Sequence, residues 1–498
     1  MTNGRMQLDF SLGQLRGARP VDEEDRFRIL VLANLSGSEA ARVALPLAQR
    51  KPLRIDIDNF DAVLARISPR LELTFDGVVQ SLEFRVMDDF HPDRLFAKLA
   101  SFVALRQLRA ELADPTQFRR AAAALGGLPV KASDTSAPPD LAHENDIERL
   151  LGRKPSAPAT AAAITPGQNL DHWLRNLVAP HVVQDTTNEQ AQLISAADAA
   201  IACEMRRVLH HPDFQALEAN WRGVERLAQE LELGETMELL LLDTTRDELA
   251  QDLSASAANL AQSGLHHHLC GPQTEPPDGQ RWSLLLSDLS FGADFAELQL
   301  LAGLGAMAGR AGAPLLAAAR PSLLGCPSAV HLAEPKTWKP LDPEVAEFWR
   351  VLRQSPLGPW IGLALPRILA RQPYGPGSDP INAFAFDELA PRDHAAYLWA
   401  SPAFSLALLA GQAFMEAGWD MELAAGLDLG DLPSHIYRED GESRQQACAE
   451  VNISESAGEA ILKHGTMALL SYRSRNAARL LRWQSIAEPA RALQAAWA

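Results

Sequence analysis

The sequence has few cysteines and no long apolar run, and both shortages exclude classes of protein. Its four cysteines (Cys203, Cys270, Cys326 and Cys448) are scattered and form no CxxC pair, which indicates reduced thiols, not a disulfide framework. No stretch reaches the roughly 18 apolar residues needed to span a bilayer. The opening stretch, MTNGRMQLDFSLGQLRG, contains no signal-peptide core. We therefore expect a cytoplasmic protein without direct membrane insertion.

Basic residues are also in deficit, with 46 Lys and Arg against 63 Asp and Glu, so the formal net charge is −17. A nucleic-acid binder normally presents a basic face, and anionic membrane surfaces attract basic segments. We expect neither as a partner. The 498 residues, 47% of them hydrophobic, are typical of a globular protein and too many for one ordinary core.

The motifs of common enzymes are missing as well. The sequence contains no GxxxxGK[ST], HExxH or GxSxG, so nothing supports an NTPase, a zinc protease or an α/β hydrolase. GLGAMAG (303–309) lies inside an Ala/Gly/Leu-rich helical run, which favours helix packing over dinucleotide binding. LHHHLC (265–270) places three histidines consecutively, so they point in different directions, unlike zinc ligands. We expect no enzyme activity, no catalytic, cofactor-binding or metal-binding residues, and no cofactor.

The stretch HHPDFQALEANWRG (210–223) raises two alternatives, a metal or acid/base site and a structural helix. Pro212 suits a first helical turn and Asp213 suits the positive end of a helix. Glu218 and Arg222 stand four residues apart, as in an ordinary surface pair. The helix is favoured because apolar residues recur along one face, at Phe214, Leu217, Trp221 and Val224.

Two compositional regions precede this helix. Residues 1–125 predict a small α/β unit. A strand is expected at 26–35, and another over 81–95 that ends in a turn into a helix at about 92–112. Alternating apolar residues predict a half-buried N-terminal strand (Met6, Leu8, Phe10 and Leu12). Residues 126–168 are rich in Pro, Ala and Ser and predict a linker. Within the linker, residues 144–153 predict a short helix that is a candidate docking segment (Ile147, Leu150 and Leu151).

Residues 169–498 alternate between helical and strand patterns. Buried strands are predicted at 237–243, 281–291, 313–319 and 359–366, and a largely buried helix at 397–419. Thr245 and Glu248 have the spacing of a capping box at a helix start. The predicted fold class is therefore α/β with some α+β character, in which a small N-terminal unit precedes a larger one with a mainly parallel sheet.

Several blocks resemble the large subunit of the type VI secretion contractile sheath, called TssC or VipB. They are HHPDFQALEANWRGVERL, LLLLDTTRDELAQDL, LALPRILARQPYG, FAFDE, the 397–419 helix and DLPSHIYREDGE, and they run in collinear order. The blocks RILVLANLSG, KPLRIDIDNFDAVL and LEFRVMDDFHPDRL are similar to the small subunit, TssB or VipA. The resemblance implies a phage-tail-sheath-like architecture in which one chain fuses two subunits.

In that family the subunits polymerise around an inner tube, contraction drives the tube into a target cell, and an AAA+ ATPase disassembles the sheath. The resemblance thus implies other sheath subunits as partners, and with them the inner tube, the baseplate and the ATPase. The N-terminal strand (Met6 to Leu12) matches a strand that the family donates to a neighbour. The large-subunit resemblance stops near RWQSIAEP (482–489), so residues 169–498 are expected to lack the family's C-terminal region. Two functions stay open, a sheath component and a non-polymerising adaptor, cap or regulator that binds sheath or baseplate proteins.

Overall fold

The computed structural model describes residues 25–37, 45–125, 178, 189–271, 281–390, 392–473 and 475–495. The described chain divides into two compact units. Unit 1 contains residues 1–95, 206–381 and 387–498, and unit 2 contains residues 96–205 and 382–386. The N-terminal strand (Met6 to Leu12) and the whole predicted linker (126–168), with its candidate docking helix, lie outside the described residues.

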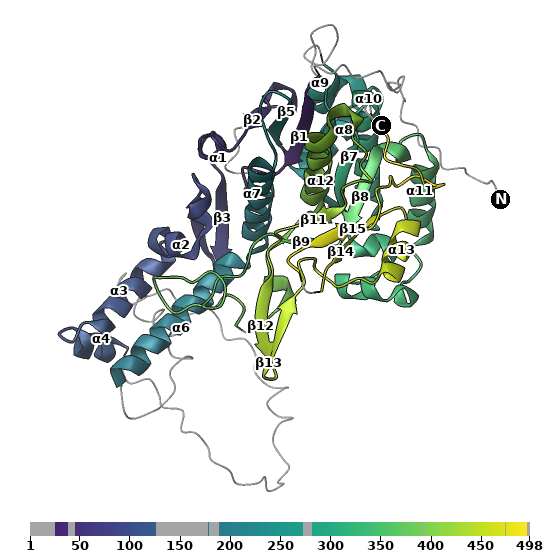
Figure 1. The fold of residues 1–498 in the computed structure, drawn as a ribbon. Coiled ribbons are helices and arrows are strands. Elements are labelled where there is room, and N and C mark those ends of the chain that lie inside the picture. Colours follow the sequence, from purple (N-terminus) through teal and green to yellow (C-terminus); the bar gives the residue numbers. More distant parts are fainter. Residues whose placement is uncertain are drawn as a thin grey trace, which may run out of the picture. The chain divides into compact units, whose positions relative to one another are not determined.

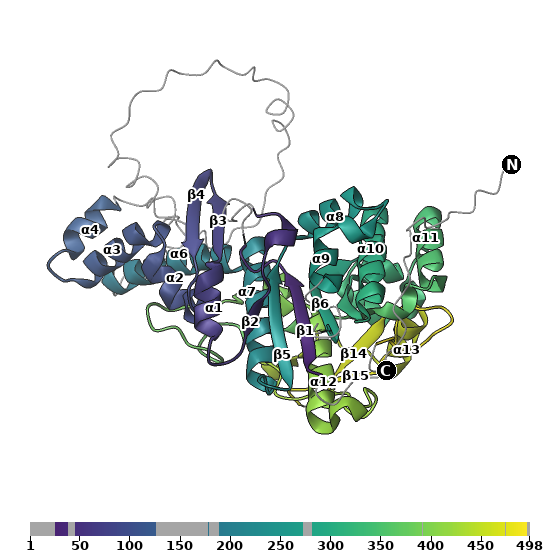
Figure 2. The same cartoon turned by 90° about the horizontal axis from the view of Figure 1, so that it is seen from above.

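Unit 1 is built on a nine-stranded sheet (Figures 1 and 2) in the order β11-β15-β14-β8-β7-β6-β1-β5-β2. Its six central strands run parallel, and antiparallel strands close both edges. The strands are β1 (Phe27–Ala33), β2 (Leu53–Ile55), β5 (Met237–Asp243), β6 (Leu284–Phe291), β7 (Leu315–Ala319), β8 (Ile361–Leu365), β11 (Asp428–Leu429), β14 (Met467–Ser471) and β15 (Ala478–Leu480). The predicted α/β class with a mainly parallel sheet is confirmed.

The central position of β1 is the main feature of this topology. β1 pairs with β5 over its whole length, from Phe27 opposite Met237 to Ala33 opposite Asp243, and with β6 on its other side. A strand from the first 125 residues therefore lies between two strands that follow residue 230 within the same chain. The expected linker between residues 125 and 169 falls outside the described residues, and the domain boundaries stay a prediction.

Helices cover both faces of this sheet. One face carries α7 (Pro212–Glu230) and α12 (Pro402–Ala417). The other face packs into a large apolar core with α8 (Arg246–Ala255), α9 (Gly264–Cys270), α10 (Phe295–Ala311), α11 (Pro343–Gln354) and α13 (Glu455–Lys463). α8 begins with the predicted capping box, in which Thr245 and Glu248 bond reciprocally. Burial on both faces explains why the central strands are continuous apolar runs.

Smaller elements complete unit 1. They are α1 (Phe60–Ile67), the hairpin β3 (Arg70–Phe75) and β4 (Val78–Glu83), the pair β9 (Ile368–Leu369) and β10 (Trp399–Ala400), and the hairpin β12 (His435–Glu439) and β13 (Glu442–Gln446). The strand predicted over 81–95 was placed too far along, because β4 ends at Glu83. The backbone then turns, where the Asp89 carboxylate accepts hydrogen bonds from the N–H groups of Arg85 and Val86.

Unit 2 is helical in the part that the structure describes. It contains α3 (Ser101–Ala113), α4 (Phe118–Ala124), most of α6 (Glu189–Leu209) and the end of α2 (Pro92–Lys98). Arg109 on α3 forms an ion pair with Asp198 on α6, with its Nε 2.5 Å from Oδ1. The single helix predicted at 92–112 is wrong: it is broken at Leu99 and Ala100, where Arg106 Nη1 donates to the carbonyl of Ala97 instead.

Candidate functional site

The helix predicted from HHPDFQALEANWRG is α7, and the reasons given for it hold. Pro212 occupies its first turn, and the N-cap His211 accepts a hydrogen bond from the Asp213 N–H through Nδ1. The four apolar residues of the predicted stripe are all inside the protein, with exposed fractions of 0 to 2% (Phe214, Leu217, Trp221 and Val224). Packing thus accounts for one face of α7.

The pair Glu218–Arg222 is not the surface pair that the spacing suggested. Glu218 is fully buried, and its Oε1 lies 3.6 Å from Arg222 Nε. The main partner of Glu218 is Arg371, whose Nε donates to Oε1 at 2.7 Å. The i to i+4 spacing does not distinguish an exposed pair from a buried one, because a distant residue supplies the counterion.

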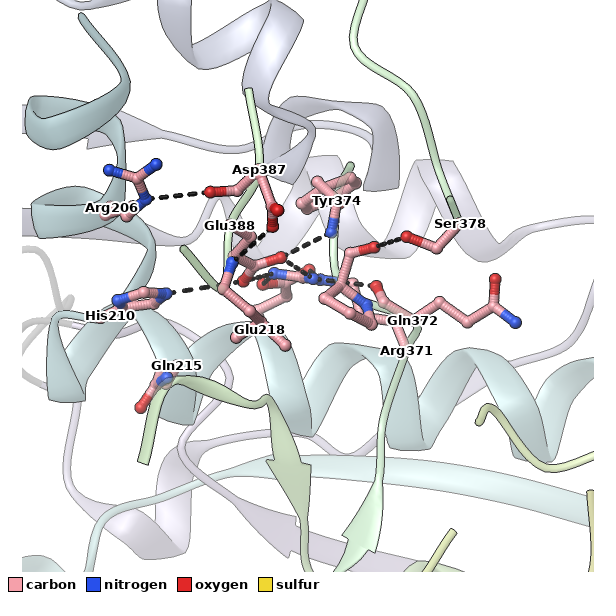
Figure 3. A network of polar contacts seen from close by, with 12 residues as sticks. Arg206, His210, Gln215, Glu218, Arg371, Gln372, Tyr374, Ser378, Asp387 and Glu388 are labelled. Carbon is pink, nitrogen blue, oxygen red and sulfur yellow. Dashed lines mark hydrogen bonds and ion pairs between the residues drawn. The ribbon is translucent and has the colours of Figure 1, made fainter. Parts of the chain in front are cut away.

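Arg371 is the centre of a buried network within unit 1 (Figure 3). Its guanidinium donates two hydrogen bonds to Glu218, at 2.7 and 3.3 Å, and two to Glu388, at 2.8 and 3.0 Å. A further bond runs to the carbonyl of Gln372. The side chains of Arg371, Glu218 and Glu388 are 9%, 0% and 2% exposed. The network therefore holds two carboxylates and an arginine out of water.

Aromatic and imidazole groups surround these charges. The Arg371 guanidinium lies over the ring of Tyr374 at 4.0 Å, and the Tyr374 N–H donates to Glu388 at 2.7 Å. Burial tends to lower the pKa of Arg371, but the two glutamates outweigh it and raise that pKa. Burial lowers the pKa of His210, whose Nε2 lies 3.9 Å from Glu388. The arginine therefore keeps its charge and the histidine is neutral at pH 7.

The network joins segments that are far apart in the sequence. Arg206 Nε donates to the carbonyl of Asp387 at 2.9 Å, and the Glu388 N–H donates to the carbonyl of Tyr374. Asp387 and Glu388 are thus bonded to the end of α6 and to the 371–374 segment. Both carboxylates already accept hydrogen bonds from Arg371. This arrangement anchors loops, and it leaves neither carboxylate free to act as a general base.

The other sequence candidates also have structural places. LHHHLC forms α9, where His268 Nε2 lies 2.7 Å from the carbonyl of Leu47. GLGAMAG lies inside α10, where a Cβ on Gly305 would come within 2.5 Å of the Ile361 side chain. Close packing of α10 on β8 explains that glycine. Among the residues with described positions, no group of three His, Cys, Asp or Glu could hold a metal ion.

Arg371 and Glu388 were not predicted to be members of a site. Both lie within blocks that carried the family resemblance, LALPRILARQPYG and FAFDE. They follow no periodic pattern, and only the resemblance singled out their segments. No helix in the described part of the chain is both long and apolar enough for a transmembrane segment.

Comparisons with known proteins identify the family. Residues 191–487 match the VipB family model, described as the EvpB/VC_A0108 tail sheath N-terminal domain. Residues 5–121 match the model for type VI secretion system VipA, VC_A0107 or Hcp2. β1 and β2 belong to the second match, and the remaining strands of the nine-stranded sheet belong to the first.

Two curated relatives agree with these matches. The type VI secretion system sheath protein TssC1 of Pseudomonas aeruginosa is 29% identical over 317 residues, which are 62% of this chain and 64% of TssC1. Sheath protein TssB1 of the same organism is 33% identical over 117 residues, which are 22% of this chain and 66% of TssB1. The chain spans just under two thirds of the length of each relative. With more than half of its residues in the VipB match, the chain belongs to the type VI secretion tail-sheath family, as a fusion of a TssB-like and a TssC-like segment.

Proposed function

We propose that this chain is a structural component of a type VI secretion sheath, in which one polypeptide does the work of the TssB–TssC pair. The observation that carries the proposal is β1 of the TssB-like segment, which lies between β5 and β6 of the TssC-like segment. A central strand has its backbone groups bonded on both sides, so it cannot leave without exposing them. The two segments therefore act as one building block.

The finer parts of the proposal follow from the family. The building block polymerises in the cytoplasm around an inner tube, and contraction of the polymer propels that tube. Other sheath subunits are the first partners, and the inner tube, the baseplate and an AAA+ ATPase are further ones. The candidate docking helix (Ile147, Leu150 and Leu151) is proposed as the ATPase contact. The buried Arg371 network supports a mechanical role, because its ion pairs fasten the 371–374 segment and Glu388 to α7.

The N-terminal strand (Met6, Leu8, Phe10 and Leu12) is proposed as the segment that joins neighbouring copies. Pairing along a sheet edge uses backbone N–H groups, which proline lacks. The variant Leu8→Pro with Phe10→Pro should therefore block assembly and leave the fold of unit 1 unchanged. Ala161→Pro, in the Pro-rich linker, is the matched control because the linker already contains prolines.

Electron microscopy of the purified chain tests the proposal directly. Tubules or stacked rings from the wild type and from Ala161→Pro, but not from the double proline variant, support the sheath role. Strictly monomeric particles under all conditions, with capture of sheath or baseplate proteins from the native host, would favour the adaptor, cap or regulator instead.

A further inference from the structure

A cavity of about 660 Å³ lies in unit 1 at the carboxyl ends of β6, β7 and β8. Asp288 and Ser290 of β6, Ala319 of β7 and Leu365 of β8 line it, and Asn220 of α7 lies on another wall. In open parallel sheets, ligands bind outside the carboxyl ends of the strands, next to the point where the strand order reverses. Here β5 lies on one side of β1 while β6, β7 and β8 lie on the other, so the reversal is next to β6. The cavity thus has the size and the position of a ligand site.

Asp288 is the distinctive group of this cavity. Its Oδ2 accepts hydrogen bonds from the Asn34 N–H at 3.1 Å and from Asn220 Nδ2 at 2.8 Å. No residue with described coordinates donates to its other oxygen, Oδ1. The register of β6 against β7 shifts between Leu286 and Ser290, and such bulges re-aim side chains next to functional sites. One carboxylate oxygen is thus held in place, while the other accepts no hydrogen bond from the part of the chain that the structure describes.

The charges around Asp288 indicate what the cavity accepts. Arg367 donates to Glu450 through two bonds, at 2.9 and 2.6 Å, and Arg320 is paired with Glu297. Both arginines on the cavity wall therefore already have counterions. Behind the wall, Arg246 on α8 favours the charged form of Asp288, whereas Asp243 at the end of β5 opposes it. Burial is the largest effect and raises the pKa of Asp288 to about 6, so the group is ionised at pH 7.5.

We propose that this cavity binds an organic cation, an ammonium or guanidinium group that donates a hydrogen bond to Asp288 Oδ1. A charged donor supplies Oδ1 with a hydrogen bond that no described residue makes, and charge-assisted bonds to carboxylates are stronger than those between neutral groups. An anion is disfavoured because the two arginines are paired. A divalent metal is disfavoured too, since it requires several oxygen ligands and Asp288 belongs to no metal-binding group among the described residues. This inference does not depend on sheath assembly.

Titration calorimetry of the full chain at pH 7.5 tests the proposal, with agmatine as the probe and 1,4-butanediol as its neutral control. Agmatine should bind at one site and butanediol should not. Asp288→Asn should weaken the binding of agmatine at least tenfold. The amide oxygen can still accept the hydrogen bonds from Asn34 and Asn220, but the negative charge is lost. Ala216→Trp, at an exposed position of the cavity wall on α7, should block binding with Asp288 intact. Asp58→Asn, an exposed carboxylate outside the cavity, is the matched control and should bind like the wild type.

Two further arms complete the experiment. N-acetyl-arginine methylamide mimics a side chain of a protein partner: tighter binding than agmatine assigns the site to a protein segment, and weaker binding assigns it to a free small cation. Lowering the pH from 7.5 to 5.0 should weaken binding roughly tenfold, because Asp288 becomes protonated while the neighbouring Glu450, with a pKa of about 2, stays charged. Failure of both cations to bind, or equal binding by wild type, Asp288→Asn and Ala216→Trp, overturns the proposal.

Discussion

The buried network around Arg371 makes the strongest prediction about stability. Replacing Arg371 by Met removes four charge-assisted hydrogen bonds and leaves Glu218 and Glu388 without their main counterion. Because these two side chains are 0% and 2% exposed, water cannot solvate them in the folded state. Removing one partner of a buried ion pair typically lowers the free energy of unfolding by about 3–5 kcal/mol. We expect a loss in that range for Arg371→Met.

This loss of stability should come from the two buried carboxylates that no longer have a counterion, and not from a loss of side-chain volume. Methionine fills a similar space, so little of the effect is a cavity. Replacing Glu218 and Glu388 by Gln in the Arg371→Met background removes both buried charges. We expect that triple variant to recover much of the lost stability, since uncharged replacements of buried ion pairs are often neutral.

Urea unfolding followed by tryptophan fluorescence is the assay, because Trp221 and Trp360 are buried in unit 1. With a denaturant slope of about 3 kcal/mol per M, Arg371→Met should lower the midpoint by roughly 1 M or more. Arg350→Met is the matched control, since Arg350 pairs with Glu347 on the surface of α11 and should leave the midpoint unchanged. An Arg371→Met midpoint equal to that of the control would refute the reasoning.

The remaining predictions concern packing and pH. Gly223→Ala should cost about 1–3 kcal/mol, because its Cβ would lie 2.6 Å from the Phe404 ring; an unchanged urea midpoint contradicts this. Asp288→Asn should stabilise the fold at pH 7.5 by up to about 3 kcal/mol, since folding raises that pKa from 3.8 to about 6 and disfavours the charged form. The gain should vanish below pH 3.8, and urea titrations at both pH values measure it. Burial tends to raise the pKa of Glu450, but hydrogen bonds from Arg367 and His394 outweigh it and lower that pKa from 4.5 to about 2. Stability should therefore fall as the pH drops through this window, and less steeply in Arg367→Met; urea titrations of both proteins measure the slope.

Local patterns predicted most of the elements that build unit 1. β5 has the predicted bounds, 237–243, because a strand buried on both faces is a continuous apolar run. The start of α7 at Pro212 and the capping box of Thr245 and Glu248 were also predicted, since each depends on residues within one helical turn. These features are local, and a single sequence carries them.

The features that the sequence did not predict depend on contacts between distant residues. Glu218 is buried because Arg371, 153 positions away, supplies its counterion, and no spacing within α7 reveals that. The break between α2 and α3 depends on Arg106, which bonds back to Ala97 from the following helix. The Asp288 cavity depends on strand order, which brings Asn34, Asn220 and Asp288 together from three separate segments.

The central claim is that β1 of the TssB-like segment completes the sheet of the TssC-like segment within the same chain. Hydrogen exchange of the backbone amides of Phe27–Ala33, followed by mass spectrometry over a hundredfold dilution, tests it most directly. The account predicts that β1 exchanges as slowly as β5 and β6, and at the same rate at every concentration, because a central strand opens only when the sheet unfolds. Fast exchange in β1, or protection that disappears on dilution, would show that β1 is not held in its own chain's sheet and would contradict the account.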